Sequence, residues 1–378
     1  MPLGVTLTLY IGPQNVKPAP RELMEALQSV EVSHNDSGRS GFQLVFQTGR
    51  SNRDRKDYQL MGSPLLQPFN RVILVVTINA TAEVLMDGII TNQQFAPSQD
   101  LGGSTLTLTG EDISVMMDLE ERSVEHPNQS DVIIVNQILS RYQRYGLIPK
   151  VITPPFNDQP SQNDRIPTQQ GTDLSYIQQL AGVHSFIFYV TAGPTLKSNL
   201  AYWGPPKRNP PPQKALSINQ SGYSNVNSIS VQYNALAATQ LKGQFQDRQT
   251  NEKREISITR STRRPALAAK PVLSSQSQVR IQQFRDSGES FEKAQSIAQS
   301  RVDQAVDGAV TITGELDTAR YGAILRLRGL VGLRGVGQTQ DGLYYVKSVT
   351  HKIQKGDYKQ NFTLTREGSG SRVQRVDI

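Results

Sequence analysis

The chain has 378 residues, a net charge of +7 and no cysteine, so disulfide scaffolds, thiolate metal sites and cysteine catalysis are excluded. Its four histidines, His34, His126, His184 and His351, do not lie at the spacing of a local zinc motif. The 37 Gln, 29 Gly and 21 Pro residues favour a β-rich protein with hydrated surfaces, and the length predicts more than one domain.

The charges are unevenly distributed along the chain. Residues 1–125 contain 9 basic and 15 acidic residues, whereas residues 241–286 contain 10 basic and 4 acidic residues. The basic stretch around Arg260–Arg264 has no interleaved aromatic residues, so it indicates a solvated connector or a protein contact. We expect no specific nucleic-acid binding, although binding through the 241–287 segment is kept as an alternative. The longest apolar run, Val72–Ile78, is too short for a membrane span, so no membrane anchor is expected.

Residues 1–125 predict a first β domain. The first strand signal is an alternation of apolar with polar residues at Leu3, Val5, Leu7, Leu9 and Ile11. Similar patterns predict further strands over 30–48, 72–78, 83–95 and 104–109. A helix is predicted over Arg21–Val30, and residues 49–70 are expected to form a polar loop.

The chain from 126 to 213 has a largely helical pattern. Apolar residues at helical spacing predict two helices, over Asp131–Gly146 and Asp173–His184. Gly146 is the expected stop of the first helix, and Thr172 or Asp173 can cap the second. An aromatic strand is predicted over Ser185–Val190, and the prolines that follow residue 204 predict a rigid connector.

The last part of the chain predicts a second β region that is interrupted. A strand is expected over Val226–Tyr233, whereas 241–287 is polar, basic and poorly periodic. A helix is predicted over Phe291–Val306 by its apolar spacing. The C-terminal strands are predicted over Val310–Gly314, Ala323–Leu327, Val331–Leu333, Leu343–Lys352 and Gln360–Arg366.

These patterns predict a mainly β protein with inserted helices (α+β). The expected architecture is two similar β-barrel domains, one of them discontinuous, with a small α/β domain between their segments. The four expected parts are a first barrel over 1–125, an α/β insertion over 126–213, a second barrel over 214–240 plus 305–378, and a polar basic insertion with a helix over 241–304.

An internal similarity supports the pair of barrels. Asp87–Phe95 and Ser104–Thr109 resemble Tyr345–Ile353 and Asn361–Arg366, because each pair reads as a strand, a loop and a strand. Two unrelated hairpins would show the same pattern, so duplication is a hypothesis at this point. If it holds, three copies of the chain would present six similar units, which would match a three-fold object to a six-fold ring.

An acidic cluster is the main candidate for catalysis, because paired carboxylates can hydrolyse glycosidic bonds. Its members are Glu111, Asp112, Asp118, Glu120 and Glu121. We favour the alternative that these charges form a solvated loop and an interface after a strand. Ser98 and Ser104 have no nearby His–Asp context that would indicate a nucleophile.

The remaining candidates also favour structural roles. Gly329, Gly332, Gly335 and Gly337 lie between predicted strands, and no Lys-Ser/Thr pair follows, so we expect a turn and not a phosphate loop. His351 lies on a predicted strand and is expected to be structural, and Trp203 is expected to pack the connector. We therefore assign no catalytic, cofactor-binding or metal-binding residue and expect no cofactor.

Five segments, taken in order, resemble a known family. They are Ser104–Asp118, Asp131–Tyr142, Gln170–Leu174 with the aromatic strand after it, Asp341–His351 and Phe362–Arg366. None of them is specific alone, but their succession resembles the late-control D family of phage tail proteins. The same domain forms the N-terminal part of the type VI secretion spike protein VgrG.

The resemblance implies a structural protein and not an enzyme: a baseplate hub of a contractile phage tail or phage-derived injection system. Such a hub is a homotrimeric adaptor between the six-fold tail tube and the three-fold spike. It would be made in the bacterial cytoplasm and assembled into the baseplate with the tail-tube protein and other baseplate proteins. Because the chain ends at Ile378, soon after the last hairpin, the spike is expected from a separate chain.

Two features leave other functions open. The 241–287 stretch is longer and more basic than the core of the family, so its role is not given by the resemblance. The acidic cluster keeps a peptidoglycan-degrading tail-associated enzyme as one alternative. A nucleic-acid-binding protein that uses 241–287 is the other.

Overall fold

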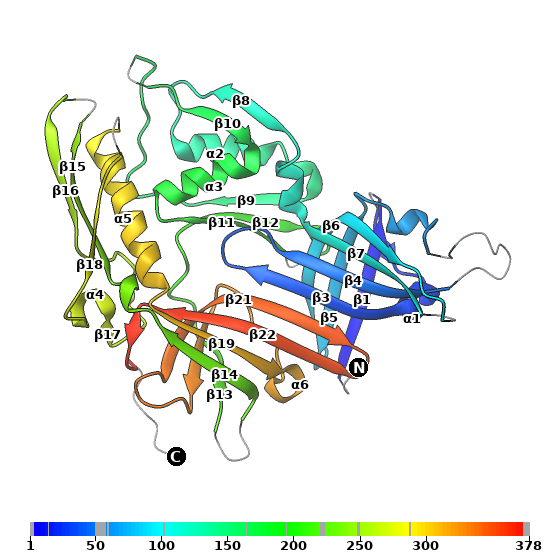
Figure 1. Cartoon of the computed structure of the whole chain (residues 1–378). Coiled ribbons are helices and arrows are strands. Elements are labelled where there is room, and N and C mark those ends of the chain that lie inside the picture. Colours follow the sequence, from blue (N-terminus) through cyan, green and yellow to red (C-terminus); the bar gives the residue numbers. More distant parts are fainter. Residues whose placement is uncertain are drawn as a thin grey trace.

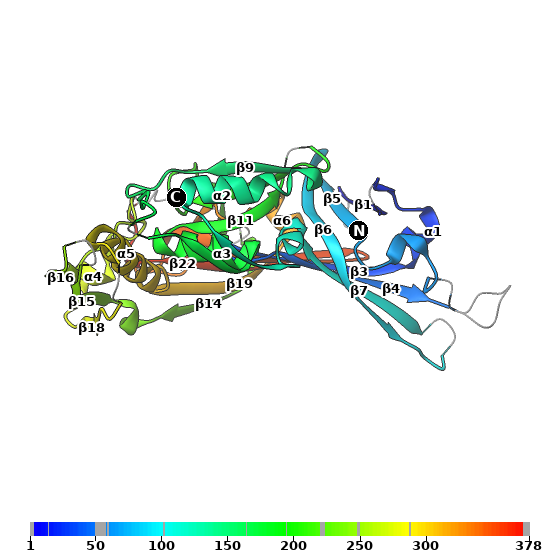
Figure 2. The same cartoon turned by 90° about the horizontal axis from the view of Figure 1, so that it is seen from above.

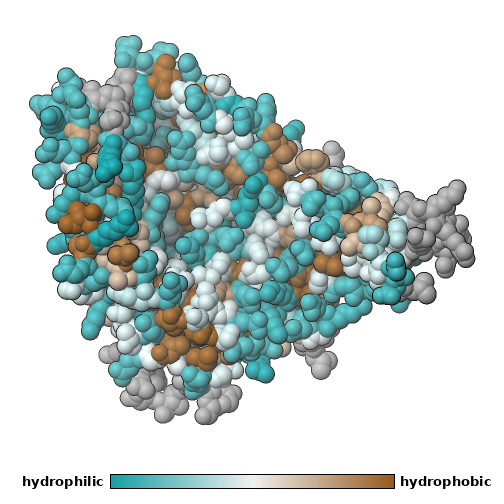
Figure 3. Space-filling model, in the orientation of Figure 1, coloured by the Kyte–Doolittle hydropathy of each residue, from teal (hydrophilic) through white to brown (hydrophobic). Residues whose placement is uncertain are grey.

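A computed structural model describes residues 4–13, 15–49, 58, 60–100, 103–163, 165–193, 195–219, 224–247, 250–286 and 289–372. In Figure 1 the N-terminal strands lie on the right, the C-terminal strands lie at the bottom, and the central part of the chain lies above and to the left of them. Figure 2 shows that the molecule is much longer than it is thick. Hydrophilic residues cover most of the face seen in Figure 3, with smaller hydrophobic patches between them. None of the helices in these ranges is long and apolar enough to cross a membrane.

Most strands belong to one 13-stranded sheet, here called the large sheet. Its hydrogen-bonded order is β14-β19-β22-β21-β3-β4-β7-β6-β5-β1-β2, and β20 and β13 branch from β21. In that order the strands span Val226–Tyr233, Val310–Asp317, Asp357–Arg366, Gly342–Gln354, Leu27–Asn35, Gly41–Thr48, Ser104–Asp112, Thr81–Ala96, Arg71–Ile78, Val5–Gly12, Lys17–Pro18, Leu330–Arg334 and Gln213–Ser217. Over the described residues the path is open and ends at β14 and β2.

The N-terminal strands of the large sheet enclose a first hydrophobic core. β1 buries Val5, Leu7 and Leu9 and β4 buries Phe42 and Leu44, because alternate side chains of a strand point to one face. The strand predicted over 1–12 is confirmed over its described part, while Leu3 lies outside the described residues. Two short helices lie beside this core, α1 (Arg21–Ala26) and η1 (Pro64–Leu66). The predicted helix over 21–30 therefore ends earlier, where β3 begins.

The C-terminal strands enclose a second core. It contains Val310 and Ile312 of β19 with Phe362 of β22, and the short helix α6 (Thr318–Tyr321) adds Tyr321. The strand predicted over 323–327 is wrong. This segment is irregular, and the Leu325 N–H donates to the side chain of Gln360 at 2.8 Å instead of to a neighbouring strand.

The two halves of the large sheet are joined edge to edge. β3 of the first half pairs with β21 of the second in an antiparallel ladder that runs from Asn35↔Ser348 to Ser29↔Gln354. We call this ladder the seam. The mainly β fold with inserted helices is confirmed, but the two expected barrels are two halves of one continuous sheet, each with its own core.

The two halves share local features. The hairpins β6–β7 and β21–β22, which the sequence pairs by similarity, are both present and both contain a register shift. In each half a Phe lies opposite a Gly on the neighbouring strand: Phe42 opposite Gly110, and Phe362 opposite Gly314. A Cβ added to Gly110 or Gly314 would lie 2.3 Å or 2.6 Å from that ring, so the ring occupies the space of the missing side chain.

A small α/β unit lies beside the first half of the large sheet. Its three-stranded sheet has the order β11 (Ile187–Ala192), β12 (Asn199–Gly204) and β9 (Leu147–Val151). Its helices are α2 (Asp131–Ser140) and α3 (Asp173–Val183), and a ribbon of β8 (Glu121–Glu125) and β10 (Thr168–Thr172) lies beside them (Figure 1). Two 3-10 turns complete it, η2 (Ile113–Met117) and η3 (Gln143–Tyr145). Both predicted helices are present, and Gly146 ends the first region with a φ of 83°.

The segment treated as poorly periodic is an ordered outer unit. Its sheet has the order β16 (Lys253–Ile258), β15 (Thr239–Gln246) and β18 (Arg280–Gln283), and α5 (Phe291–Asp307) covers one face. These strands leave no clear alternation in the sequence, because charged and amide residues separate their few apolar positions. Helix α5 is confirmed within one residue. The remaining short elements are η4 (Ala235–Ala237), β17 (Lys270–Pro271), α4 (Val272–Ser275) and β23 (Gly368–Ser369).

Candidate functional site: a polar face on the large sheet

The side of the large sheet opposite its two cores carries hydroxyl and amide side chains across both halves. Neighbouring strands place these side chains in rows, because residues paired in register point to the same side. One row is Ser230, Thr313, Thr363, Ser348 and Asn35. A second row crosses the seam and runs through Asp317, Lys359, Lys352, Glu31, Gln43, Thr109 and Asn92. We call this surface the polar face.

Alternation of apolar and polar residues along the strands, interrupted only at the register shifts, produces the polar face. In β7, Thr105, Thr107 and Thr109 alternate with the buried Leu106 and Leu108. The strands β19 and β22 of the other half follow the same alternation. The local pattern was visible in the sequence, but the shared surface depends on the seam, which aligns the two halves.

Charges of both signs lie on the polar face, with carboxylates in excess. The cations are Lys347, Lys352 and Lys359, and the carboxylates are Asp36, Glu31, Glu315, Asp317 and Asp357. Lys359 Nζ lies 3.8 Å from Glu315 Oε1 and 3.7 Å from Asp357 Oδ2. Pairs of this kind are solvent-exposed and contribute at most about 1 kcal/mol to stability. The excess of carboxylates gives the surface a net negative charge.

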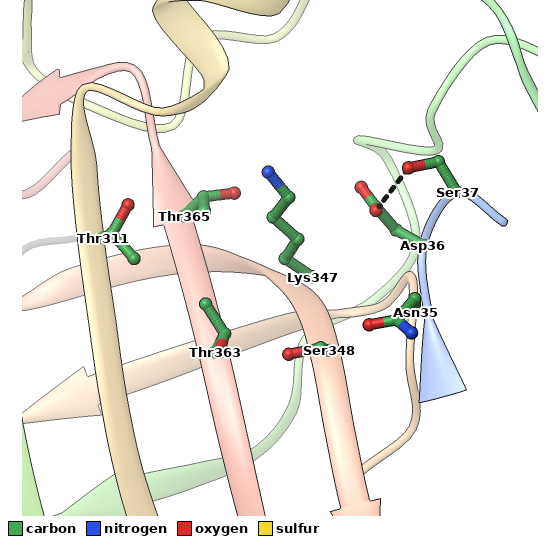
Figure 4. Close-up of a pocket in the computed structure, with 8 residues that line it drawn as sticks. All are labelled: Asn35, Asp36, Ser37, Thr311, Lys347, Ser348, Thr363 and Thr365. Carbon is green, nitrogen blue, oxygen red and sulfur yellow. Dashed lines mark hydrogen bonds between the residues drawn. The ribbon is translucent and has the colours of Figure 1, made fainter. Parts of the chain in front are cut away.

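Two adjoining hollows lie on the polar face beside the seam. One has a volume of about 270 Å³ and the other about 390 Å³, and both are lined by Ser348 and Thr363. In Figure 4 the side chain of Lys347 extends between Thr365 and Asp36 across the first hollow. Burial raises the pKa of Asp36, while the opposing charge of Lys347 lowers it. These side chains can bind water and other polar groups but provide no nucleophile–base pair.

Arg328 holds three parts of the molecule together behind the seam. Its Nε donates to the Asp36 carbonyl at 3.0 Å, its Nη2 donates to the Asn35 carbonyl, and its guanidinium lies 3.4 Å from the ring centre of Tyr189. These contacts join the β3–β4 turn, the second half of the sheet and the α/β unit. Burial lowers the pKa of Arg328, because removing the guanidinium charge from water costs free energy. The hydrogen bonds and the aromatic ring offset this cost.

A second buried arginine attaches the α/β unit to the first half. Arg71 and Asp87 form a two-bond pair, with Nε–Oδ1 and Nη2–Oδ2 distances of 2.7 Å. Arg71 also donates to the carbonyls of Tyr145 and Lys197, and Asn199 donates to Asp87 at 3.0 Å. Both members are almost fully buried. The α/β unit therefore covers the sheet at this point and marks the end of the exposed polar face.

Part of the basic segment around Arg260–Arg264 is buried inside the molecule. Arg263 is buried, and its Nη2 lies 2.8 Å from Asp307 Oδ2 on α5. Arg208, from the proline-rich connector, binds the same aspartate at 2.6 Å and Glu367 at 2.8 Å. Arg208 lowers the pKa of Glu367 against the opposing effect of burial. Arg263, which belongs to this basic segment, thus holds the segment to α5 inside the molecule.

The acidic cluster does not converge on one point. Arg39 Nη1 lies 2.8 Å from Glu111 and 3.0 Å from Asp118, and Glu120 pairs with Arg122. Asp112 is buried, which raises its pKa, and its two oxygens accept backbone N–H groups at 2.6 Å and 2.9 Å. Glu111, Asp118 and Glu120 pair with arginine, whereas Asp112 is buried and caps a turn, so Asp112 does not belong to the solvated loop that the sequence pattern favoured.

The other candidates lie at separate places. Ser104 Oγ accepts the Ser98 N–H at 3.0 Å in the β6–β7 turn. Trp203 is fully buried in the α/β core and donates to the Ile177 carbonyl at 3.2 Å, so it packs that core and not the connector. Gly335 and Gly337 have positive φ in the turn after β20. His351 is buried in the seam. Over the described ranges, no three His, Asp or Glu side chains gather as metal ligands.

The residues that hold the polar face in place could not be predicted from the sequence. Arg328, Arg71 and Arg208 bind carbonyls and carboxylates that lie far away in the chain, so no local pattern marks them. Only the near absence of large apolar residues on alternate positions of the strands indicated a hydrated surface.

No family model and no curated protein matches this sequence. Solved structures do match: the tail protein from Neisseria meningitidis MC58 has a TM-score of 0.65 at 11% identity, over 96% of this chain and 97% of that chain. The 43 kDa tail protein of prophage MuSo2 from Shewanella oneidensis has a TM-score of 0.63 at 12% identity, over 96% and 98% of the two chains. The E. coli c3393 protein, described as a type VI secretion component similar to T4 tail proteins gp27 and gp5, has a TM-score of 0.55 at 12% identity, over 90% and 73%.

The chain has the fold of phage tail proteins. The expected resemblance to tail and VgrG-related proteins is confirmed at the level of the fold. The late-control D family, the trimer and the spike adaptor stay predictions.

Proposed function

We propose that this chain is a structural component of a phage tail or a related contractile injection system, in which it forms a ring-shaped baseplate adaptor. The likeness to two tail proteins over nearly their whole length supports the first part. The two related halves of the large sheet support the second part, because three copies would offer six similar units to a six-fold tube. The tail tube, other baseplate proteins and a spike from a separate chain are its proposed partners.

The observation that carries this proposal is the polar face. A channel wall through which DNA or protein passes has to stay hydrated and must not bind strongly to what passes. Hydroxyl and amide groups keep a water layer, and an excess of carboxylates over lysines gives little attraction for a polyanion such as DNA. The polar face combines these properties over both halves of the sheet, so we propose that it lines the channel of the ring.

The two alternative functions have less support. A glycosidase needs two carboxyl groups that face one bond, whereas Glu111 and Asp118 share Arg39 and Asp112 is buried against backbone N–H groups. Binding of nucleic acid through 241–287 could not use Arg263, which is buried and pairs with Asp307, although Arg260 and Arg264 beside it are exposed.

A thiol-labelling experiment tests the channel assignment. The chain has no cysteine, so Thr107→Cys on the polar face and Ser123→Cys on β8 each introduce a single thiol. Native mass spectrometry first measures the number of copies, with three expected. In the assembled ring, a polymer-linked maleimide should label Thr107→Cys at least tenfold more slowly than Ser123→Cys, while a small maleimide labels both. Equal labelling by the bulky reagent refutes the channel assignment, and a monomer at every concentration refutes the ring.

A further inference from the structure

The three-stranded sheet of the α/β unit has one face that its own helices cover and one that they do not. Helices α2 and α3 pack on the covered face, where Leu147 of β9 and Trp203 of β12 are buried (Figure 1). Alternate residues of a strand point to opposite sides, so Ile148 and Lys150 of β9 belong to the other face. We call it the open face. In register across the three strands, it consists of Ile148, Lys150, Leu200, Tyr202, Thr191 and Tyr189.

The open face has an apolar end and a basic end. At the apolar end, Ile148 is 54% exposed and pairs in register with the half-buried Leu200. At the basic end, Lys150 is the register partner of Tyr202, and Lys207 Nζ lies 4.9 Å from the centre of the same ring. Two lysines therefore lie beside one aromatic ring, next to an aliphatic surface that water reaches.

The two lysines lack a counter-charge. Lys293 and Lys359 pair with Glu289 and Glu315, whereas Lys150 and Lys207 form no ion pair within the described part of the chain. Burial lowers the pKa of Lys207, and the charges of Lys150 and Arg328 lower it further. The open face itself contains no carboxylate. An anionic group placed here would relieve the repulsion between these cations.

The connector holds Lys207 in a fixed place. The Tyr202 hydroxyl donates to the Pro205 carbonyl at 2.8 Å, and the next residue, Pro206, restricts the backbone before Lys207. On the other side, Arg208 is bound to Asp307 and Glu367. Because the backbone around Lys207 is fixed before any partner arrives, binding would cost less conformational entropy than binding by a lysine on a free loop.

The aromatic rings of the open face are already in use. Tyr202 and Tyr189 stack with ring centres 5.0 Å apart, and Arg328 lies 3.4 Å from the centre of Tyr189. Both tyrosines are buried. Proteins that bind single-stranded nucleic acid use exposed rings on which bases stack, and neither ring is exposed here. The exposed aliphatic Ile148 beside lysines suits an acidic polypeptide better than a nucleic acid.

We propose that the open face binds a segment of another protein that carries carboxylates next to an apolar side chain. The carboxylates pair with Lys150 and Lys207, and the apolar side chain covers Ile148 and Leu200. Pro149 in the edge strand β9 lacks an N–H, so the contact uses side chains and not the addition of a strand. The contact does not require the chain to form a ring.

Selection from a library of random short peptides tests this chemistry, with the full chain as the target. Peptides retained by the wild type should be enriched in Asp and Glu beside Leu, Ile or Phe. The double variant Lys150→Gln/Lys207→Gln should lose this enrichment. A wild-type selection without acidic enrichment overturns the proposal, and so does equal enrichment on the double variant.

Fluorescence anisotropy then measures the affinity of the selected peptide for each variant. Lys150→Gln/Lys207→Gln should weaken binding about tenfold or more at low salt, and Ile148→Ser about threefold. The matched control is Lys242→Gln/Lys253→Gln, which removes two exposed lysines from the outer unit and should leave binding unchanged. Thermal unfolding checks that every variant is folded. Equal weakening by the two double variants would show an effect of net charge alone and would contradict a site on the open face.

Two measurements distinguish other occupants of the open face. If a single-stranded oligonucleotide binds more tightly than the peptide and displaces it, the face binds nucleic acid and the proposal is wrong. If Lys150→Gln/Lys207→Gln weakens association of the chain with itself in sedimentation, the occupant is a second copy, and the proposal of a different protein is wrong. None of these results bears on the proposed ring, which copy number and thiol labelling test separately.

Discussion

Acid is expected to weaken the seam through two imidazoles, the buried His351 and the half-buried His34. His34 and His351 lie on opposite strands of the seam with ring centres 5.5 Å apart, and His351 Nδ1 lies 2.9 Å from the Tyr358 hydroxyl. Burial lowers the pKa of His34 from 6.5 to about 4, and the positive charge of Arg328 adds to this shift. Burial also holds the pKa of His351 well below its ordinary value, and His34 contributes to this effect.

The sign and size of the effect follow from proton uptake. Below pH 6.5 the unfolded chain binds a proton at His34, whereas the folded chain does not until about pH 4. Stability is therefore lost progressively as the pH falls from 6.5 to 4, because protons favour the unfolded state. A shift of this size corresponds to about 3 kcal/mol at 1.4 kcal/mol per pH unit. His351 adds a loss of the same sign.

Denaturant unfolding at several pH values between 7 and 4 measures this loss in the wild type and in His34→Gln. Other shifted groups, such as Glu367, whose pKa is lowered, and Asp112, whose pKa is raised, are present in both proteins and cancel in the difference. We expect the free energy of unfolding of the wild type to fall more steeply than that of His34→Gln, so that the difference between the two curves changes by about 3 kcal/mol between pH 7 and pH 4. Parallel curves over this range would falsify the assignment of a neutral His34 in the seam.

Three further predictions concern the supports of the sheet. Asp87→Asn leaves Arg71 buried without its charge partner, so the free energy of unfolding should fall by about 3–5 kcal/mol. A loss below about 1 kcal/mol would contradict an ion pair that is shielded from water. Arg263→Gln should lower stability by about 1–3 kcal/mol and leave any binding to DNA fragments unchanged in a salt titration, whereas reduced binding would support the nucleic-acid alternative. Gly314→Ala places a Cβ 2.6 Å from the Phe362 ring and should cost about 1–3 kcal/mol, while Gly332→Ala, with 3.7 Å to its nearest atom, should be close to neutral in thermal unfolding.

Local patterns predicted much of the fold. The alternation of Thr105, Thr107 and Thr109 with leucines predicted β7, since a half-buried strand needs one apolar and one polar side. Thr172 caps α3 by accepting the Ser175 N–H, as its position before an amphipathic run predicted. Gly146 ends the preceding region in a left-handed conformation that a glycine adopts without strain.

Predictions failed where few apolar residues marked an element. In β15 and β16, Leu241, Phe245 and Ile256 contact α5, but glycine, lysine and glutamine separate them, so the period is weak. Ala323–Leu327 has strand-like residues, yet Gln360 binds the backbone of this segment through its side chain and no strand lies beside it. In both cases a partner distant in the chain decided the conformation.

The amino-acid sequence alone determined the kind of surface this protein has: strands with one apolar and one hydroxyl- or amide-bearing side, and helices with defined ends. These properties depend on residues a few positions apart, so they can be read locally. Only the tertiary structure decided that β3 pairs with β21, that the two halves share one polar face, and that Arg71 and Arg328 hold the α/β unit beside it. These features depend on register and on buried charge pairs between distant segments, and neither leaves a periodic pattern in the chain.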